Sequence, residues 1–139
     1  MTNDTIATTD PKIDAVQRVY AAFGRGDIEG LLAELAEDVD WASESTSDSA
    51  PWYGEYHGRD DVPRFAKALG ESVEVLEFTP LSLTSNETDV MATIRWTIRA
   101  RSTGKTATMN LYHWWRFADG KINFYRGSAD SELTASVFA

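Results

Sequence analysis

The sequence predicts an α+β fold in which three N-terminal helices cover a curved antiparallel β-sheet, wrapped around a pocket as a cone-shaped α+β barrel. The chain has 139 residues, a length typical of one domain. Apolar residues recur at helical spacing in its first half, and they alternate with polar residues between tight turns in its second half. We therefore expect a flexible tail at residues 1–10 and a single domain at 11–139.

Two helices are expected at the start of this domain. Asp10 and Pro11 offer a capping side chain followed by proline at the first helical position, a favourable helix start. Gly24 marks the end of this helix, and Asp27 caps the next one. The apolar residues fall on one side of each helix: Ile13, Val16, Val19, Tyr20 and Phe23 in the first, then Ile28, Leu31, Leu32 and Leu35 in the second.

A short strand, a loop and a third helix follow. Residues 39–42 have strand character, and the serine-rich residues 43–50 are typical of a loop. Pro63 fits only in the first turn of the third helix, and Gly70 is expected to end it. The apolar side of that helix consists of Val62, Phe65, Ala66 and Leu69.

The second half of the domain is expected to form strands joined by hairpins. The Asp119-Gly120 pair is a strong signal for the last of these turns. Neighbouring antiparallel strands can be joined by tight turns whereas parallel strands need long crossovers, so the pattern favours an antiparallel meander roofed by the helices. The expected strands cover residues 73–78 with a continuation at 81–85, then 90–101, 106–117 and 122–127.

Charge and composition exclude several classes of partner. The chain has 13 Lys and Arg against 22 Asp and Glu, a formal net charge of −9, which disfavours nucleic acid and anionic membrane surfaces. It has no cysteine and its two histidines are far apart in the sequence, so we expect no metal site. Residues 1–10 lack a signal-peptide pattern and no apolar run is long enough to span a bilayer, which predicts a cytoplasmic protein.

Four short motifs occur in a characteristic order. They are Gly-Asp at 26–27, Ala-Glu-Asp-Val-Asp-Trp at 36–41, Tyr-His-Gly-Arg-Asp at 56–60 and Asp-Gly-Lys-Ile at 119–122. Across residues 12–131 this pattern resembles the SnoaL-like branch of the nuclear transport factor 2-like superfamily. The resemblance implies the fold but leaves the chemistry open, because the superfamily includes ketosteroid isomerases, polyketide cyclases, epoxide hydrolases, dehydratases and non-catalytic binding modules.

The catalytic set of the ketosteroid isomerases is largely missing. The resemblance places their aspartate base at Ser43, their tyrosine at Val19 and their protonated acid at His113. Tyr20 is adjacent to Val19 but lies roughly 100° around the helix. Two of the three roles are lost, so isomerisation by that mechanism is not expected.

Two residues remain as candidate catalytic groups. The final acid of the epoxide hydrolases and cyclases corresponds to Asp130, although the hydrolases' arginine and aspartate fall on Ile94 and Trp96. A carboxylate buried beside aromatic rings would have a raised pKa and could act as a general base. His113 falls on the apolar face of its strand, where a neutral imidazole can donate to an oxyanion or relay a proton. The structural alternatives are a solvated carboxylate near the chain end and a core histidine satisfied by a neighbour.

Six aromatic residues are the expected ligand-binding lining of the pocket. Tryptophan and tyrosine carry a polar atom that needs a partner, so a cavity rich in them would suit a flat, partly oxygenated ring system. The alternative for each is an ordinary core position. The six are Trp41, Trp52, Tyr53, Trp96, Trp115 and Tyr125.

The opposite face of the sheet is expected to be an interface. Arg95 and Arg99 on one strand, and Tyr112 and Trp114 on the next, should point away from the pocket. Such residues are typical of interfaces, and relatives of the resembled family often dimerise through this face, which predicts a homodimer. The alternative is a solvated face shielded by arginine stems.

Two main hypotheses of function follow. In the first, the chain is a cofactor-independent isomerase or cyclase, in which Asp130 or His113 removes a proton next to the carbonyl of a hydrophobic cyclic or polyketide-like ketone. In the second, it is a non-catalytic dimeric module that binds a small apolar or aromatic molecule. A cavity reached by both His113 and Asp130 favours the enzyme, and a candidate side chain that points to solvent favours the module. A third possibility is a protein that binds a partner through the outer sheet face.

Overall fold

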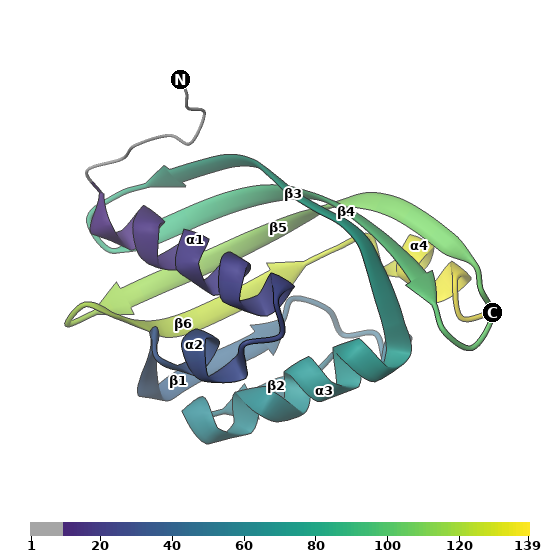
Figure 1. Cartoon of the computed structure of the whole chain (residues 1–139), viewed down its shortest axis with the longest axis horizontal. Helices are drawn as coiled ribbons and strands as arrows, with labels where there is room; N and C mark the ends of the chain where they lie inside the picture. Colours follow the sequence, from purple (N-terminus) through teal and green to yellow (C-terminus); the bar gives the residue numbers. More distant parts are fainter. Residues whose placement is uncertain (1–9) are drawn as a thin grey trace.

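The computed structural model describes residues 10–139 and shows the predicted α+β architecture, with helices packed on the concave side of a curved sheet (Figure 1). Residues 1–9, which make up most of the predicted tail, lie outside the described residues. The elements in chain order are α1 (Pro11–Gly24), α2 (Ile28–Leu32), β1 (Leu35–Ser43), β2 (Glu55–His57), the 3₁₀-helix η1 (Arg59–Asp61), α3 (Val62–Ser72), β3 (Val73–Ser85), β4 (Asp89–Ala100), β5 (Thr106–Ala118), β6 (Lys121–Ser128) and α4 (Ser131–Ser136).

The sheet is mixed rather than fully antiparallel. Its strand order is β2-β1-β6-β5-β4-β3, and β1 runs parallel to β6 while the other neighbours are antiparallel. The antiparallel prediction holds for β3 to β6, whose hairpins fix their directions, but it is wrong for the pair β1 and β6. Most of the chain separates β1 from β6, so no tight turn sets the direction of that pair. β2 and β3 form the two edges, and the sheet does not close on itself.

The first two helices begin where the sequence predicts. The side chains of Asp10 and Asp27 each accept a hydrogen bond from a backbone N–H in the first helical turn. α2 is shorter than predicted, because Leu35 already belongs to β1, where it is fully buried. Helix α1 buries Ala15, Val16, Val19 and Ala22 against the sheet.

Two other helix boundaries differ from the prediction. α3 continues through Gly70 to Ser72, since an exposed glycine costs a helix only about 1 kcal/mol relative to alanine and does not oblige it to stop. The short helix α4 is not predicted by the sequence pattern. Asp130 caps it, and Thr134 within it and Val137 at its C-terminal end are buried.

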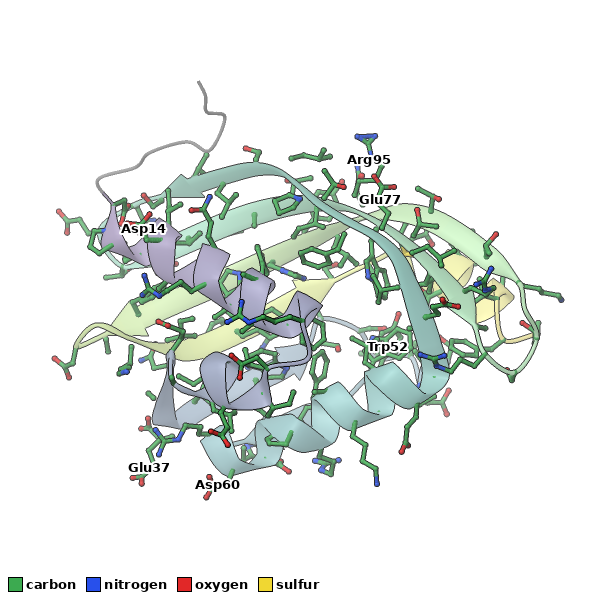
Figure 2. The ribbon with its side chains drawn as sticks, in the orientation of Figure 1. Asp14, Glu37, Trp52, Asp60, Glu77 and Arg95 are labelled. Carbon is green, nitrogen blue, oxygen red and sulfur yellow. The ribbon has the colours of Figure 1, made fainter. Side chains whose placement is uncertain are left out.

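The long strands have the predicted alternation. On β4 and β5 the residues Ile94, Trp96, Ile98 and His113 are buried on the inner face, while Tyr112 is exposed on the outer face. β3 runs without interruption past Pro80, as an edge strand can, because an edge position needs no hydrogen bond from the missing N–H. Figure 2 shows the two sides: Trp52 lies between the sheet and α3, and Glu77 and Arg95 lie together on the outer side.

Candidate functional site

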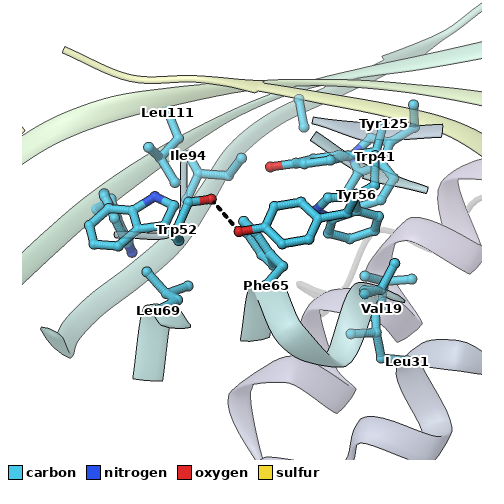
Figure 3. Packing of buried hydrophobic residues seen from close by; sticks show 14 of the residues in the cluster. Val19, Leu31, Trp41, Trp52, Tyr56, Phe65, Leu69, Ile94, Leu111 and Tyr125 are labelled. Carbon is cyan, nitrogen blue, oxygen red and sulfur yellow. Dashed lines mark hydrogen bonds between the residues drawn. The ribbon is translucent and has the colours of Figure 1, made fainter. Parts of the chain in front are cut away.

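An aromatic-lined cavity lies between the inner face of the sheet and the helices α1 and α3. Its volume is about 80 Å³. Side chains from α1, α3 and five of the six strands surround it, together with the loop that follows β1. Figure 3 shows the buried cluster around the cavity, in which the Tyr56 hydroxyl of β2 donates to the backbone oxygen of Trp52 at 3.0 Å and ties that loop to the sheet.

All six aromatic residues predicted to line a pocket lie at this cavity. Tyr125 forms a cluster with two tryptophans, with ring centroids 4.2 Å from Trp41 and 4.5 Å from Trp115, which are themselves 5.7 Å apart. Trp52 meets Trp96 edge to face at 6.0 Å, and it meets Tyr53 at 5.7 Å. These tilted and edge-to-face contacts restrict the orientations of the rings on this part of the wall.

His113 points into this cavity from the centre of β5. Alternation along the strand turns its side chain to the inner face, as the sequence predicts, and only 7% of the residue is exposed. The imidazole is enclosed by aromatic rings, with centroids 5.2 Å from Tyr125, 5.6 Å from Tyr20 and 5.8 Å from Trp115.

Tyr20 of α1 connects two of these groups through its hydroxyl. The hydroxyl oxygen lies 2.7 Å from Nδ1 of His113, and it accepts a hydrogen bond from Nε1 of Trp115 at 3.2 Å. The indole N–H can only donate, and Nδ1 of His113 is the acceptor within reach of the tyrosine proton among the described residues, so we assign Tyr20 as the donor to His113. The three side chains therefore form a relay in which Trp115 donates to Tyr20 and Tyr20 donates to His113.

With Tyr20 assigned as the donor, the tautomer of His113 follows. An Nδ1 that accepts a proton from Tyr20 leaves the hydrogen of the neutral imidazole on Nε2. Within residues 10–139 Nε2 has no hydrogen-bond partner, but unlike Nε1 of Trp41 it is not a fully buried unpaired atom, so water or a ligand in the cavity can reach it. The histidine therefore presents a directed N–H donor, not a basic lone pair, to whatever occupies the cavity.

Burial keeps the polar groups of this cavity uncharged. Desolvation lowers the pKa of His113 to about 3, so its imidazole is neutral near pH 7. Desolvation also raises the pKa of Tyr20 and the pKa of Tyr125 well above their usual range. The site therefore acts through hydrogen bonds and dipoles, and these are stronger in an apolar surrounding than in water.

The direction of the Tyr125 side chain depends on Gly127. A Cβ atom at position 127 would lie 2.2 Å from the Tyr125 hydroxyl oxygen, closer than any real contact of that kind. The absence of a side chain thus lets the phenol lie back along β6, with its ring against the cavity. Glycine is needed here for close approach, not for a left-handed backbone.

Sequence reasoning missed Tyr20 as a site residue. Counting from the family motif selected Val19, yet α1 presents both residues to the interior because its buried face is broad. A signal was available. A tyrosine on the apolar side of a helix has a hydroxyl that needs a hydrogen-bond partner. When that side packs on the core, the partner must be another buried polar side chain, and such side chains are candidates for a site.

Asp130 does not line the cavity. It is exposed, and its Oδ1 accepts a hydrogen bond at 2.9 Å from the backbone N–H of Leu133 as the cap of α4. The expectation that this carboxylate is buried beside aromatic rings is therefore wrong, and Ser128 and Ala129 face the cavity instead. The physical reason is local: an aspartate directly before a helix finds unpaired backbone donors within one turn.

No ionised side chain of the described residues takes the place of Asp130 at the cavity. Among the described residues, the lining of the cavity includes no Asp, Glu, Lys or Arg. Ser43 lies at the cavity where the isomerases' base was mapped, and its neighbour Glu44 is exposed, with its Oε1 4.0 Å from Nε of Arg126. Nowhere in residues 10–139 do three or more His, Cys, Asp or Glu side chains gather closely enough to hold a metal ion.

The outer face of the sheet is mixed in character. Arg95 and Arg99 point outward as expected, and each pairs with a glutamate of β3, at 3.4 Å to Glu77 and 2.7 Å to Glu74. Tyr112 is 51% exposed, whereas Trp114 is half-buried.

None of the helices in the described part of the chain is long and apolar enough to cross a membrane.

A six-stranded curved sheet that holds a small apolar cavity beneath N-terminal helices defines an NTF2-like pocket protein. The chain belongs to the SnoaL-like domain family, whose sequence pattern matches residues 16–125. This confirms the family resemblance. No curated protein matches the chain.

Solved structures share the whole fold. An NTF2-like protein of unknown function from Burkholderia pseudomallei K96243 is 25% identical, with 93% of this chain and 98% of that chain covered and a TM-score of 0.85. TerC, co-crystallised with polyporic acid, is 24% identical, with 90% and 98% covered and a TM-score of 0.80. A candidate polyketide cyclase from Xanthomonas campestris pv. campestris is 21% identical, with 93% and 97% covered and a TM-score of 0.75. At these identities the last two similarities concern the fold alone.

Proposed function

We propose that this chain binds a small, uncharged, hydrophobic cyclic compound, whose carbonyl oxygen accepts a hydrogen bond from Nε2 of His113. The observation that carries the proposal is the relay from Trp115 through Tyr20 to His113, because it turns the imidazole into a fixed donor aimed at an apolar cavity. Nε2 is accessible from the cavity, so the carbonyl oxygen of a ligand can replace water as its acceptor.

Three further observations support this function. The absence of charged groups from the described lining disfavours ionic ligands, which would be desolvated without compensation. The Nε1 donor of Trp41, a second residue of the lining, is also buried without a hydrogen-bond partner. TerC, which has the same fold, was crystallised with a small ligand, polyporic acid.

The binding function can be tested with two probes that differ only in the carbonyl. 4-Phenylcyclohexanone should bind more tightly than phenylcyclohexane, measured by calorimetry and by the shift in Tm. His113→Phe should remove this preference, a loss of about tenfold in affinity for the ketone if one hydrogen bond of about 1.4 kcal/mol disappears. His57→Gln alters the exposed histidine and is the control. Equal affinity of the unaltered chain for both probes would contradict the proposal.

A second candidate function is cofactor-independent isomerisation or cyclisation of a hydrophobic, polyketide-like ketone. The neutral His113 favours it, because an Nε2–H donor can stabilise the negative charge that develops on a carbonyl oxygen when a neighbouring carbon loses a proton. The missing element is a base: Asp130 is directed elsewhere, so the proton must pass to water or to the substrate itself. Binding alone is therefore the better supported function.

Proton exchange separates the two candidates. In D₂O, an enzyme should accelerate exchange of the α-protons of 4-phenylcyclohexanone above the buffer rate, and His113→Phe should abolish the acceleration. Exchange at the buffer rate, with tight binding retained, assigns the chain to the non-catalytic module.

We further propose that the chain is a homodimer that associates through the outer sheet face. Arg95, Arg99, Tyr112 and Trp114 lie there, and Met91 adds an exposed apolar side chain beside them. Tyr112→Glu should shift the sedimentation coefficient to that of a monomer, and Lys67→Glu on α3 should not. An unchanged sedimentation coefficient would favour the alternative, a solvated outer sheet face.

The cytoplasmic location also stays a prediction.

A further inference from the structure

The cavity beside His113 is too small for the ligand class proposed above. Its volume of about 80 Å³ is well below the ~150 Å³ of an engineered cavity that holds benzene. A substituted ring that places its carbonyl at His113 must therefore extend beyond this cavity. This inference rests on the proposed function, and it concerns where the remainder of the ligand lies.

A larger groove lies directly outside the cavity wall. It has a volume of about 490 Å³ and runs between the C-terminal ends of α1 and α3 and the first half of β3. Four side chains line both the groove and the inner cavity: Tyr20, Phe23, Leu69 and Phe78. The partition between the two spaces is therefore one layer of side chains thick.

The groove has exposed apolar side chains on β3, and the charged side chains of Glu77 and Arg101 also line it. Val75 and Leu76 of β3 line it and are 42% and 44% exposed. Leu76 is the extra residue of a β-bulge, because Val75 pairs with Ile98 while Glu77 pairs with the next residue of β4. A bulge re-aims the side chain of its extra residue, and here that side chain is presented to the groove.

Phe78 is the part of the partition that can move at least cost. Tyr20 is held by hydrogen bonds to His113 and Trp115, so its displacement would leave buried polar atoms unpaired. Phe78 has no polar side-chain atom to leave unpaired; it packs against the core, with its ring centroid 5.0 Å from that of Tyr20 and 6.4 Å from that of His113. It also stands on an edge strand between two register shifts, one before Glu77 and one after Pro80.

We propose that the groove is the outer half of one divided ligand site, and that its occupant is the apolar extension of the molecule whose carbonyl ring binds at His113. Displacement of Phe78 joins the two spaces into one that falls within the ~300–1,000 Å³ of small-molecule sites. The ligand class is accordingly an elongate, largely apolar ketone of two or more rings. Phe78 and Leu76 determine the specificity for its length.

The chain supplies a matched pair of variants for the test. Leu76 and Leu81 are both leucines on β3, both the extra residue of a bulge, and 44% and 47% exposed, but only Leu76 lines the groove. Leu76→Glu should weaken the binding of 4-phenylcyclohexanone about tenfold and leave that of cyclohexanone unchanged. Leu81→Glu should change neither. Both substitutions are at exposed positions and should leave the fold intact.

The proposed movement of Phe78 is tested by the rate at which the ligand binds. Phe78→Leu, a smaller apolar side chain that keeps the wall filled, should raise the association rate constant of 4-phenylcyclohexanone about tenfold in stopped-flow fluorescence. Its effect on cyclohexanone should be within a factor of two. Equal rates for the variant and the unaltered chain would overturn the role of Phe78.

The outcomes for the groove and for the proposed function can be told apart. If the unaltered chain prefers 4-phenylcyclohexanone over phenylcyclohexane but Leu76→Glu binds the ketone with unchanged affinity, the groove proposal fails and the proposed function stands. If the carbonyl makes no difference, the proposed function fails. If Leu76→Glu changes the sedimentation coefficient instead of ligand affinity, the groove is a contact between protein chains and the inference is overturned.

Discussion

The two faces of β5 carry adjacent tryptophans with opposite surroundings. Trp115 is on the inner face, 1% exposed, and its Nε1 donates to the Tyr20 hydroxyl at 3.2 Å. Trp114 is on the outer face, half-buried, and its Nε1 donates to Oδ2 of Asp89 at 2.8 Å. Both indoles are satisfied, but one acceptor is neutral and the other is a carboxylate.

The difference follows from the cost of burying charge. Inside the domain an ionised acceptor would lose its hydration, so a phenol serves in its place. At the outer face, partial burial alone would raise the pKa of Asp89, but hydrogen bonds from Thr88, Trp114 and Arg116 outweigh it and lower that pKa. The pleat of a single strand thus separates a neutral binding site from an ionic surface.

The largest expected effect comes from removing the inner tryptophan. Trp115→Ala should lower the free energy of unfolding by roughly 3–5 kcal/mol, because it opens a void in the core and leaves Tyr20 without its donor. Trp114→Ala should cost about 1 kcal/mol, since it loses one partly solvated hydrogen bond. Urea denaturation measures both, and equal losses would contradict the contrast between the faces.

The pH dependence of stability should reveal the buried histidine. The pKa of His113 is about 3 in the folded chain, against ~6.5 when unfolded, so between these values the unfolded state binds the extra proton. The free energy of unfolding should therefore fall as the pH falls through this window, by up to about 1.4 kcal/mol per pH unit. His113→Gln should lack this component, whereas His57→Gln should retain it. Parallel urea titrations at several pH values compare the three chains.

Removing the Tyr20 hydroxyl should break the relay without opening a large void. Tyr20→Phe should cost about 1–3 kcal/mol of folding free energy, because Nδ1 of His113 and Nε1 of Trp115 lose their partner. The imidazole ¹⁵N resonances should change from one tautomer to a mixture. Tyr112→Phe removes a hydroxyl from the exposed face of β5, the strand of His113, and should change neither the folding free energy nor the ¹⁵N resonances. A single unchanged tautomer in Tyr20→Phe would show that the relay does not orient His113.

The smallest expected effect is at the other predicted catalytic residue. Asp130→Ala should cost about 1 kcal/mol through the lost cap of α4, and it should leave affinity for 4-phenylcyclohexanone unchanged. Chemical denaturation and calorimetry provide the two measurements. A tenfold loss of affinity would return Asp130 to the site.

Prediction from sequence succeeded where a local rule fixes the direction of a side chain. Period-two alternation places His113 and Trp115 inward and Tyr112 outward, and the flanking hairpins hold the register. The same alternation brings the predicted aromatic residues of β4 and β5 to one cavity. At Asp130 this rule no longer applies, because the residue follows the last strand and its side chain caps the helix α4 that comes next in the chain.

The sequence by itself determined the class of the fold, the faces of the long strands and the family, because periodicity, turn chemistry and short motifs are local properties. Tertiary structure alone decided that β1 lies parallel to β6, that Tyr20 meets His113 across 93 positions of chain, and that a thin wall separates the cavity from the groove. Those features depend on which distant surfaces bury each other, and the energy of such contacts has no signature in neighbouring residues.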